Sequence, residues 1–461
     1  MIIKKQKQEV SMINVKWITM NDHTDICFPE SFKKTYSMTR KRVKFKFGTW
    51  IRTLNVTYKK DLPVDVIALS DRLQDDLFIP EDLLFEMKLT KNTMQIGPMI
   101  LWIAAATHER LDQRLVNLEK RINNFVKVRG MICVCAEEGI NIENKKIEGY
   151  YYRPDDELEG SKWVKAVFHY PGGIFKRVPL SKKVNDHLNE TTKGKMFNSY
   201  FFNKWEMWKW LSKDKNLVKH LPYTEKLMNV DQISRMLEAY PSVYIKPSKG
   251  SEGKRIMKLE KQNHPFNILK RTKPVISIKD DTNNEENLQH IENHPLVQKS
   301  LNSSRQYLIQ QGVPTKYKSS QVDFRIYMLK NSNFKWESMG ITARVSEKNS
   351  IITNLRRLAY WQNGREALKS IYGLKEEEAV ILERKVVKIC KRACRIADEK
   401  GNYGDFAIDF VIDKDLHMWI LEMNLRQVYP VEDPAFEPKV KSTPFSYAMS
   451  LDGFPENLSV N

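Results

Sequence analysis

The alternation of apolar and polar residues predicts that the first part of the chain is rich in strands. From Lys41 to Tyr58, basic and apolar residues alternate, as in a strand with one buried face and one solvated, cationic face. The run from Asp65 to Leu69 predicts another strand. The pattern ends at Gln95-Ile-Gly-Pro98, so we expect residues 1–95 to form a basic, β-rich amino-terminal domain.

A different pattern begins after Pro98. Met99 to Ala106 is typical of a buried strand, and a second apolar strand follows from Gly130 to Cys135. Between these strands, apolar residues recur at helical spacing, at Leu111, Leu115, Leu118, Ile122 and Phe125. This strand–helix–strand order predicts a small, doubly wound α/β domain over residues 96–200.

The remainder of the chain mixes both periods. Helical patterns cover Trp205–Leu211, Val230–Ala239 and Glu376–Glu399, and strand patterns lie between them. The longest helix carries one apolar stripe, made of Val380, Val387, Cys390, Cys394 and Ala397. We therefore predict a third unit over residues 201–450, in a chain of the α+β multidomain class.

The segment from Gly404 to Asn424 is typical of two strands around a polar turn. If the strands close antiparallel around Lys414 to His417, the facing pairs are Asp409 with Glu422, Val411 with Ile420 and Asp413 with Met418. Asp409, Glu422 and Asn424 then share one face, with cross-strand neighbours about 5 Å apart, which suits one or two Mg²⁺ ions. Taken alone, the segment is explained better as a surface hairpin with a solvated polar face.

A loop rich in glycine and serine lies upstream between two predicted strands. Lys246 ends the first strand, and Gly250, Ser251 and Gly253 follow in the loop. Backbone N–H groups of such a loop can bind phosphate oxygens, and a lysine adds a positive charge. A hairpin with a glycine turn explains the same residues about as well. Farther on, residues 307–313 suggest a strand running into a connection whose backbone groups could bind an adenine edge.

Two further strands carry arginines on a polar face. Asp323 and Arg325 share one side of their strand, and Arg344 alternates with apolar neighbours on the next strand. An inward-facing arginine needs an anionic partner, which is more often a protein carboxylate than a phosphate. Asn354 and Arg357 follow on a loop and add an amide and another guanidinium group.

The order and spacing of these motifs resemble the YheC/YheD family of endospore coat-associated proteins, in the ATP-grasp superfamily. The resemblance covers roughly residues 95–450 and rests on an ordered set: Lys204 in Phe202-Asn-Lys-Trp, Leu221-Pro-Tyr-Thr224, Lys246, Gln310-Gln311, Asp323-x-Arg325, Ala343-Arg344-Val345, Thr353-Asn354-Leu-Arg-Arg357, Asp409 and Glu422-x-Asn424. It implies an ATP-grasp fold preceded by a pre-ATP-grasp α/β domain.

The resemblance also implies that the chain binds ATP and Mg²⁺ and assigns a role to each motif. ATP contacts fall to Lys204, Lys246, Gly250, Ser251, Gly253, Gln310, Gln311 and Val313, phosphoryl or acyl contacts to Arg325, Arg344, Asn354 and Arg357, and magnesium to Asp409, Glu422 and Asn424. The implied reaction is ADP-forming ligation of a carboxylate to an amine through an acyl phosphate. Neither substrate is named by the sequence.

Four positions depart from the family pattern. Arg255 and Leu358-Ala359 stand where related chains usually have glycines, and Gln427 replaces a proline. A side chain at a glycine position costs free energy if the backbone needs φ > 0. Because the lysines and metal ligands are retained, nucleotide binding is better supported than turnover. We expect a working but slow ligase. The alternative is a catalytically silent, ATP-binding structural protein of the spore coat.

Composition agrees with a soluble protein of two or three domains. The chain has 461 residues, of which 41% are hydrophobic. Its longest apolar run, residues 98–106, is far shorter than the roughly 18 residues of a membrane span, and no signal peptide pattern is visible at the amino end. Five scattered cysteines favour reduced, buried thiols. We expect a cytoplasmic protein, which the resemblance associates with the spore coat.

Positive charge is concentrated near the amino end. The formal net charge is +19, and residues 1–60 hold 14 Lys and Arg against 4 Asp and Glu. A solvated sheet face is the simpler explanation. The alternative is a docking surface for an acidic protein or an anionic polymer, which adds a third candidate function. No nucleic-acid-binding motif accompanies the charge.

Overall fold

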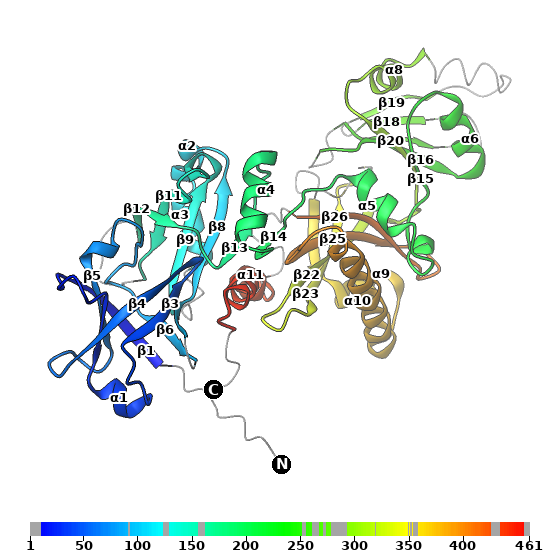
Figure 1. Cartoon of the computed structure of the whole chain (residues 1–461). Helices are drawn as coiled ribbons and strands as arrows, with labels where there is room; N and C mark the ends of the chain where they lie inside the picture. Colours follow the sequence, from blue (N-terminus) through cyan, green and yellow to red (C-terminus); the bar gives the residue numbers. More distant parts are fainter. Residues whose placement is uncertain are drawn as a thin grey trace.

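Four β-sheets follow one another along the chain, and helices lie against and between them (Figure 1). The structure is a computed structural model that describes residues 11–90, 93–122, 129–154, 162–250, 255–260, 267–270, 273–277, 293–318, 320–348, 350, 353, 358–425 and 434–455. Within these residues no helix is both long and apolar enough to cross a membrane. All five cysteines are buried and unpaired, as predicted, and burial raises the pKa of each thiol.

The first sheet is a closed barrel with the strand order β1-β5-β2-β4-β3-β7-β6. Its elements are β1 (Ser11–Ile18), β2 (Ile26–Pro29), α1 (Ser31–Thr35), β3 (Arg42–Phe47), β4 (Trp50–Lys59), β5 (Val66–Ser70), η1 (Asp71–Leu73), β6 (Phe85–Leu89) and β7 (Thr93–Gly97). The single strand predicted up to Tyr58 is wrong. Gly48, at φ +56°, turns the chain between β3 and β4, which pair as a hairpin.

The second sheet confirms the predicted strand–helix–strand unit, because β8 pairs in parallel with both β9 and β13. Its elements are β8 (Met99–Ala105), α2 (His108–Asp112), α3 (Leu115–Ile122), β9 (Met131–Ala136), η2 (Glu137–Gly139), β10 (Ile140–Asn141), β11 (Lys146–Tyr152), β12 (Trp163–His169), β13 (Gly173–Lys176), α4 (Lys182–Thr191) and β14 (Met196–Phe197). The predicted helix is two short helices, and Phe125 lies outside the described residues. Barrel residues such as Phe45 and sheet residues such as Met131 belong to one continuous apolar core.

The third sheet carries Lys246 and is called the lysine sheet here; its strand order is β15-β20-β16-β17-β18-β19. The segments from residue 204 up to it and through it are α5 (Lys204–Leu211), η3 (Val218–His220), β15 (Thr224–Lys226), α6 (Asp231–Ala239), β16 (Ser242–Pro247), β17 (Met257–Glu260), β18 (Asn267–Lys270), β19 (Lys273–Ser277), α8 (Pro295–Leu301) and β20 (Tyr307–Gln311). Ile233 of α6 and Val297 of α8 join Val243 and Ile245 of β16 in its core.

The fourth sheet carries Arg325 and Arg344 and is called the arginine sheet; its strand order is β24-β23-β22-β25-β26, with β21 paired to β22. Its elements are β21 (Lys316–Tyr317), β22 (Ser320–Lys330), β23 (Trp336–Ser346), β24 (Leu358–Asn363), α9 (Gly364–Tyr372), α10 (Glu376–Asp398), β25 (Asp405–Ile412) and β26 (Met418–Asn424). Cys390 and Cys394 of α10 share an apolar core with Ile408 and Phe410 of β25, so α10 covers one face of this sheet. The other face carries the candidate site.

The last helix, α11 (Glu437–Asp452), lies between the second sheet and the arginine sheet (Figure 1). Phe445 and Tyr447 join the apolar cluster of the second sheet, and Val440 contributes to a small cluster with Tyr327 of β22. Asp452 reaches the barrel junction, where it accepts a hydrogen bond from the Met99 N–H at 2.8 Å. The boundaries at residues 95, 200 and 450 stay predictions.

Candidate functional site

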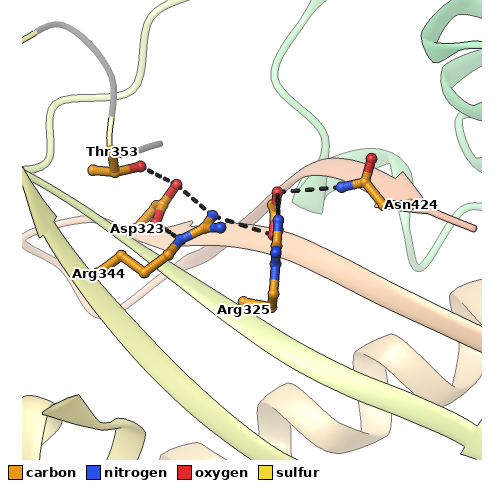
Figure 2. Close-up of polar contacts among 6 residues, drawn as sticks. Asp323, Arg325, Arg344, Thr353 and Asn424 are labelled. Carbon is orange, nitrogen blue, oxygen red and sulfur yellow. Dashed lines mark hydrogen bonds and ion pairs between the residues drawn. The ribbon is translucent and has the colours of Figure 1, made fainter. Parts of the chain in front are cut away.

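A row of charged side chains crosses the face of the arginine sheet that is turned away from α10. Asp323 lies opposite Arg344 in the pairing of β22 with β23, and Arg325 lies opposite Asp409 in the pairing of β22 with β25. Asp409 in turn lies opposite Glu422 of β26. Since cross-strand partners point to the same face, four neighbouring strands bring these five residues together. We call them the charged row. Figure 2 shows Asp323, Arg325 and Arg344 on this face.

The pairing of Asp409 with Glu422 confirms the predicted register at the centre of the hairpin. Nearer the turn, the observed pairs are Phe410 with Ile420, Val411 with Trp419 and Ile412 with Met418, so the predicted pairs of Val411 with Ile420 and Asp413 with Met418 are wrong by one residue. The cause is an irregularity after Asp409, where Leu421 has no opposite residue. The bulge leaves the polar end of the hairpin in its predicted arrangement.

Asp409 is surrounded by hydrogen-bond donors. It accepts from Arg325 Nε at 2.8 Å and Nη2 at 3.0 Å, and from Asn424 Nδ2 at 3.2 Å. Arg344 Nη2 lies 3.2 Å from the same carboxylate. Burial raises the pKa of Asp409, but the guanidinium groups of Arg325 and Arg344 outweigh burial and lower the pKa to about 2. Asp409 is therefore a stable anion.

Arg344 has a second carboxylate partner. Its Nε donates to Asp323 Oδ1 at 2.7 Å and its Nη2 donates to Asp323 Oδ2 at 2.8 Å, which is a bidentate contact. The hydroxyl of Thr353 donates to the same carboxylate (Figure 2). Thr353 belongs to the site, although the sequence analysis assigned it no role. Its position beside Asn354 in the Thr-Asn motif was the signal that could have identified it.

Lys204 joins helix α5 to the charged row. Asn203 caps this helix by accepting from the N–H groups of Trp205 and Glu206, and so fixes where the helix begins. Lys204 Nζ lies 2.8 Å from Glu422 Oε1 and donates to the carbonyl of Gly250 at 2.8 Å. The predicted phosphate lysine, phosphate loop and metal ligand thus meet at one ammonium group.

Lys246 lies on β16 with its ammonium group buried. It donates to Gln310 Oε1 at 2.6 Å, and Gln310 Nε2 donates to Thr224 Oγ1 at 2.9 Å. Burial, and secondarily the charge of Lys204, lowers the pKa of Lys246 to about 8. A buried cation whose hydrogen-bond partner is a neutral amide is well suited to an incoming anion.

The predicted adenine connection links the lysine sheet to the arginine sheet. Gln311 closes β20 against Tyr223, with its N–H donating to the Tyr223 carbonyl at 2.8 Å and its Oε1 accepting from the Tyr223 N–H at 3.1 Å. Gly312 is packed so closely that an added Cβ would lie 2.1 Å from Ser242 Oγ. Val313 follows in the link. Its contact with adenine stays a prediction.

The residues that depart from the family pattern differ in backbone conformation. Arg255 adopts φ +61°, which is the left-handed conformation that favours glycine. Leu358 and Ala359 begin the edge strand β24, whose extended backbone does not require glycine. Ser251, Gly253, Asn354, Arg357 and Gln427 lie outside the described residues.

The donor set suits Mg²⁺ that is shared with a nucleotide. Asp409 and Glu422 offer carboxylates from adjacent strands, and Asn424 offers an amide oxygen beside them. No group of three or more His, Cys, Asp or Glu side chains that could hold a metal occurs in the part of the chain that is described. Mg²⁺ is commonly bound by one or two carboxylates together with substrate phosphates, which would complete this set of oxygens.

A family model described as YheC/D like ATP-grasp matches residues 193–451, a range that contains the charged row and both lysines. This chain belongs to the YheC/D like ATP-grasp family. The predicted family and the α+β, ATP-grasp fold class are thereby confirmed. The structure adds that four residues of the charged row form ion pairs with one another and that Glu422 pairs with Lys204.

Three known proteins illustrate the similarity. Endospore coat-associated protein YheD of Bacillus subtilis (strain 168) is 28% identical over 402 residues, which cover 82% of this chain and 83% of YheD. Endospore coat-associated protein YheC of the same organism is 22% identical over 280 residues, which cover 57% of this chain and 72% of YheC. The crystal structure of D-alanyl-alanine synthetase A from Vibrio cholerae O1 biovar eltor gives a TM-score of 0.44 at 11% identity and covers 78% of this chain and 98% of the synthetase.

Proposed function

We propose that this protein binds Mg-ATP between the lysine sheet and the arginine sheet and acts as an ADP-forming carboxylate–amine ligase. The observation that carries the proposal is the Lys204–Glu422 ion pair of 2.8 Å, because it joins the predicted phosphate lysine to a predicted metal ligand beside Asp409. Membership of the ATP-grasp family supports it.

In this proposal Lys204 and Lys246 hold the phosphates of ATP, and Arg325 and Arg344 hold the phosphoryl group in transfer. Asp409, Glu422 and Asn424 would hold Mg²⁺, which neutralises phosphate charge when bound. A substrate carboxylate oxygen attacks the γ-phosphorus, and the bond to ADP breaks. An amine nitrogen then attacks the acyl carbon, phosphate leaves, and the nitrogen releases a proton. Positioning and charge stabilisation provide the acceleration.

The test is substrate-dependent release of ADP. The full chain would be incubated with ATP, Mg²⁺ and pooled carboxylates and amines, and ADP, phosphate and the mass of any new amide would be measured. The proposal predicts equal amounts of ADP and phosphate together with a condensed product. ATP binding without any substrate-dependent ADP would contradict ligation.

A catalytically silent, ATP-binding assembly protein is the second candidate. The observation that favours it is Arg255 at φ +61°, because a side chain there both strains the backbone and stands beside the predicted phosphate loop. The relative YheD is named an endospore coat-associated protein, and we propose the same association for this chain. ATP binding without turnover, together with localisation of the tagged chain to the coat, would support this candidate.

The basic barrel is proposed to bind an acidic protein or anionic polymer. Arg42 and Lys44 are exposed on β3, while the alternate residues Val43 and Phe45 are buried. Poly-glutamate is a suitable probe. The double variant Arg42→Glu/Lys44→Glu should weaken salt-sensitive binding, whereas Lys182→Glu/Lys183→Glu on α4 makes the same change of charge elsewhere. Equal loss in both variants would count against a specific surface.

A further inference from the structure

We propose that Asp323 is a positioning residue for Arg344, and that it keeps this arginine aimed at the phosphoryl group while Asp409 is engaged by metal. The inference rests on the proposed function. It concerns a carboxylate to which neither the sequence nor the family resemblance assigns a role.

Two carboxylates share Arg344 in the structure. Asp409 lies 3.2 Å from Arg344 Nη2, whereas Asp323 binds Nε at 2.7 Å and Nη2 at 2.8 Å. The contact with Asp323 fixes the plane of the guanidinium group, because two parallel N–H···O bonds leave it little rotational freedom. Asp323 is thus the stronger geometric constraint on Arg344.

Asp409 has competing tasks in the proposed function. It receives a bidentate contact from Arg325 and a hydrogen bond from Asn424, and it is also a proposed ligand of Mg²⁺. Oxygens that turn toward a cation can no longer accept fully from the arginines. Asp323, one strand away from Asp409, keeps its contact with Arg344 when this happens.

Asp323 is itself held in place. The hydroxyl of Thr353 donates to its carboxylate, and both Thr353 and Arg344 are buried. Hydrogen bonds to a buried carboxylate fix its rotamer and strengthen the contact with the partner cation. Thr353, Asp323 and Arg344 therefore form a hydrogen-bonded chain (Figure 2). In the proposed function, the phosphoryl group binds at the Arg344 end of this chain.

The test compares affinities for Mg-ATP and Mg-ADP by calorimetry, because only ATP presents the γ-phosphate. Asp323→Asn should weaken ATP binding on the order of tenfold and ADP binding far less, since the lost carboxylate charge acts on the γ-phosphate through Arg344. Arg344→Gln should have the same selective effect, and adding Asp323→Asn to it should cause little further loss. Thr353→Val should shift the ATP-to-ADP ratio in the same direction by a smaller factor.

Asp398→Asn is the matched control. Asp398 accepts from Lys330 Nζ at 2.9 Å and from Trp336 Nε1 at 2.7 Å, so it too supports a cation of β22, at the end of the strand and outside the charged row. This variant should lower stability and leave the ATP-to-ADP ratio unchanged. If Asp323→Asn weakened the affinities for ATP and ADP equally, or if its loss added fully to that of Arg344→Gln, this inference would be overturned while the proposed function would stand. Failure of the wild type to bind ATP would overturn the proposed function and this inference with it.

Discussion

Lys204 of helix α5 forms an ion pair with Glu422 of strand β26, with Nζ 2.8 Å from Oε1. The two residues are predicted to serve opposite parts of one ligand, since the lysine would contact phosphate and the glutamate would contact Mg²⁺. Their pairing means that each neutralises the other before ligand binds. In the proposed function, binding of Mg-ATP would exchange this contact for two new ones.

Removing Lys204 should therefore change the affinities for metal and for nucleotide in opposite directions. Lys204→Gln frees Glu422, so we expect binding of Mn²⁺ alone to tighten several-fold, while affinity for the nucleotide falls by tenfold or more. Electron paramagnetic resonance of Mn²⁺ and calorimetry with ATP measure the two quantities. Loss of both affinities together would contradict the exchange.

Nucleotide affinity should depend on pH through Lys246. Burial and Lys204 lower the pKa of Lys246 to about 8, so the free protein loses this charge above pH 8. Binding a phosphate there requires the ammonium form, and affinity should fall by about tenfold for each pH unit above 8. Lys246→Gln should bind weakly and show no such slope. Affinity that stays constant for the wild type between pH 7 and 9.5 would show that Lys246 does not contact the phosphates.

Arg255→Gly should stabilise the protein and speed any turnover. The left-handed conformation at φ +61° costs a residue with a β-carbon about 1 kcal/mol, and glycine relieves that cost. Lys145→Gly is a matched control at φ +55°, in the turn between β10 and β11. Both variants should raise the midpoint of urea unfolding, but only Arg255→Gly should change ATP affinity or ADP release. If Arg255→Gly and Lys145→Gly had the same effect on ATP affinity and ADP release, Arg255 would have no specific influence on the site.

The junction between the last helix and the barrel should make stability depend on pH. Burial raises the pKa of Asp452 to about 7 from 3.8, against the lowering effect of the Met99 N–H and of Lys46, Lys195 and Lys88. The folded chain therefore keeps a proton that the unfolded chain releases above about pH 4. The free energy of unfolding should fall as pH rises from 4 to 7 and then level off, a loss on the order of 4 kcal/mol.

Asp452→Asn should remove most of that slope, because the amide stays neutral throughout this range. Unfolding midpoints in urea at pH 5, 6, 7 and 8 provide the comparison. Parallel curves for wild type and variant would show that Asp452 is not the group responsible.

A turn placed at Lys414 to His417, combined with period-two alternation, was sufficient to predict the centre of the hairpin formed by β25 and β26. The turn position placed Asp409 opposite Glu422, and alternation put Asp323 on the same side of its strand as Arg325. The bulge at Leu421 could not be predicted, because it depends on packing within the finished sheet rather than on a residue type. The bidentate contact between Asp323 and Arg344 likewise requires the register of two strands, which alternation in each strand leaves undetermined.

The position of helix α11 also could not be predicted from the sequence pattern. Residues Phe445 to Ser450 are all buried, so the helix shows no single apolar stripe that would point to one neighbour. Its second half is buried all round because it packs between the second sheet and the arginine sheet. The barrel, in turn, shares its core with the second sheet, so charge substitutions test its surface better than truncation does.

The measurement that tests the central claim most directly is thermal unfolding of the full chain with and without Mg-ATP. A ligand at a hundredfold excess over its Kd stabilises the folded state by about 2.7 kcal/mol, so the wild-type Tm should rise by several degrees. Glu422→Ala should fold and show no Mg-dependent rise with ATP, whereas Glu337→Gln, an exposed carboxylate on the same sheet, should behave as the wild type does. Equal Mg-ATP shifts in wild type and Glu422→Ala would contradict a nucleotide site on the charged row.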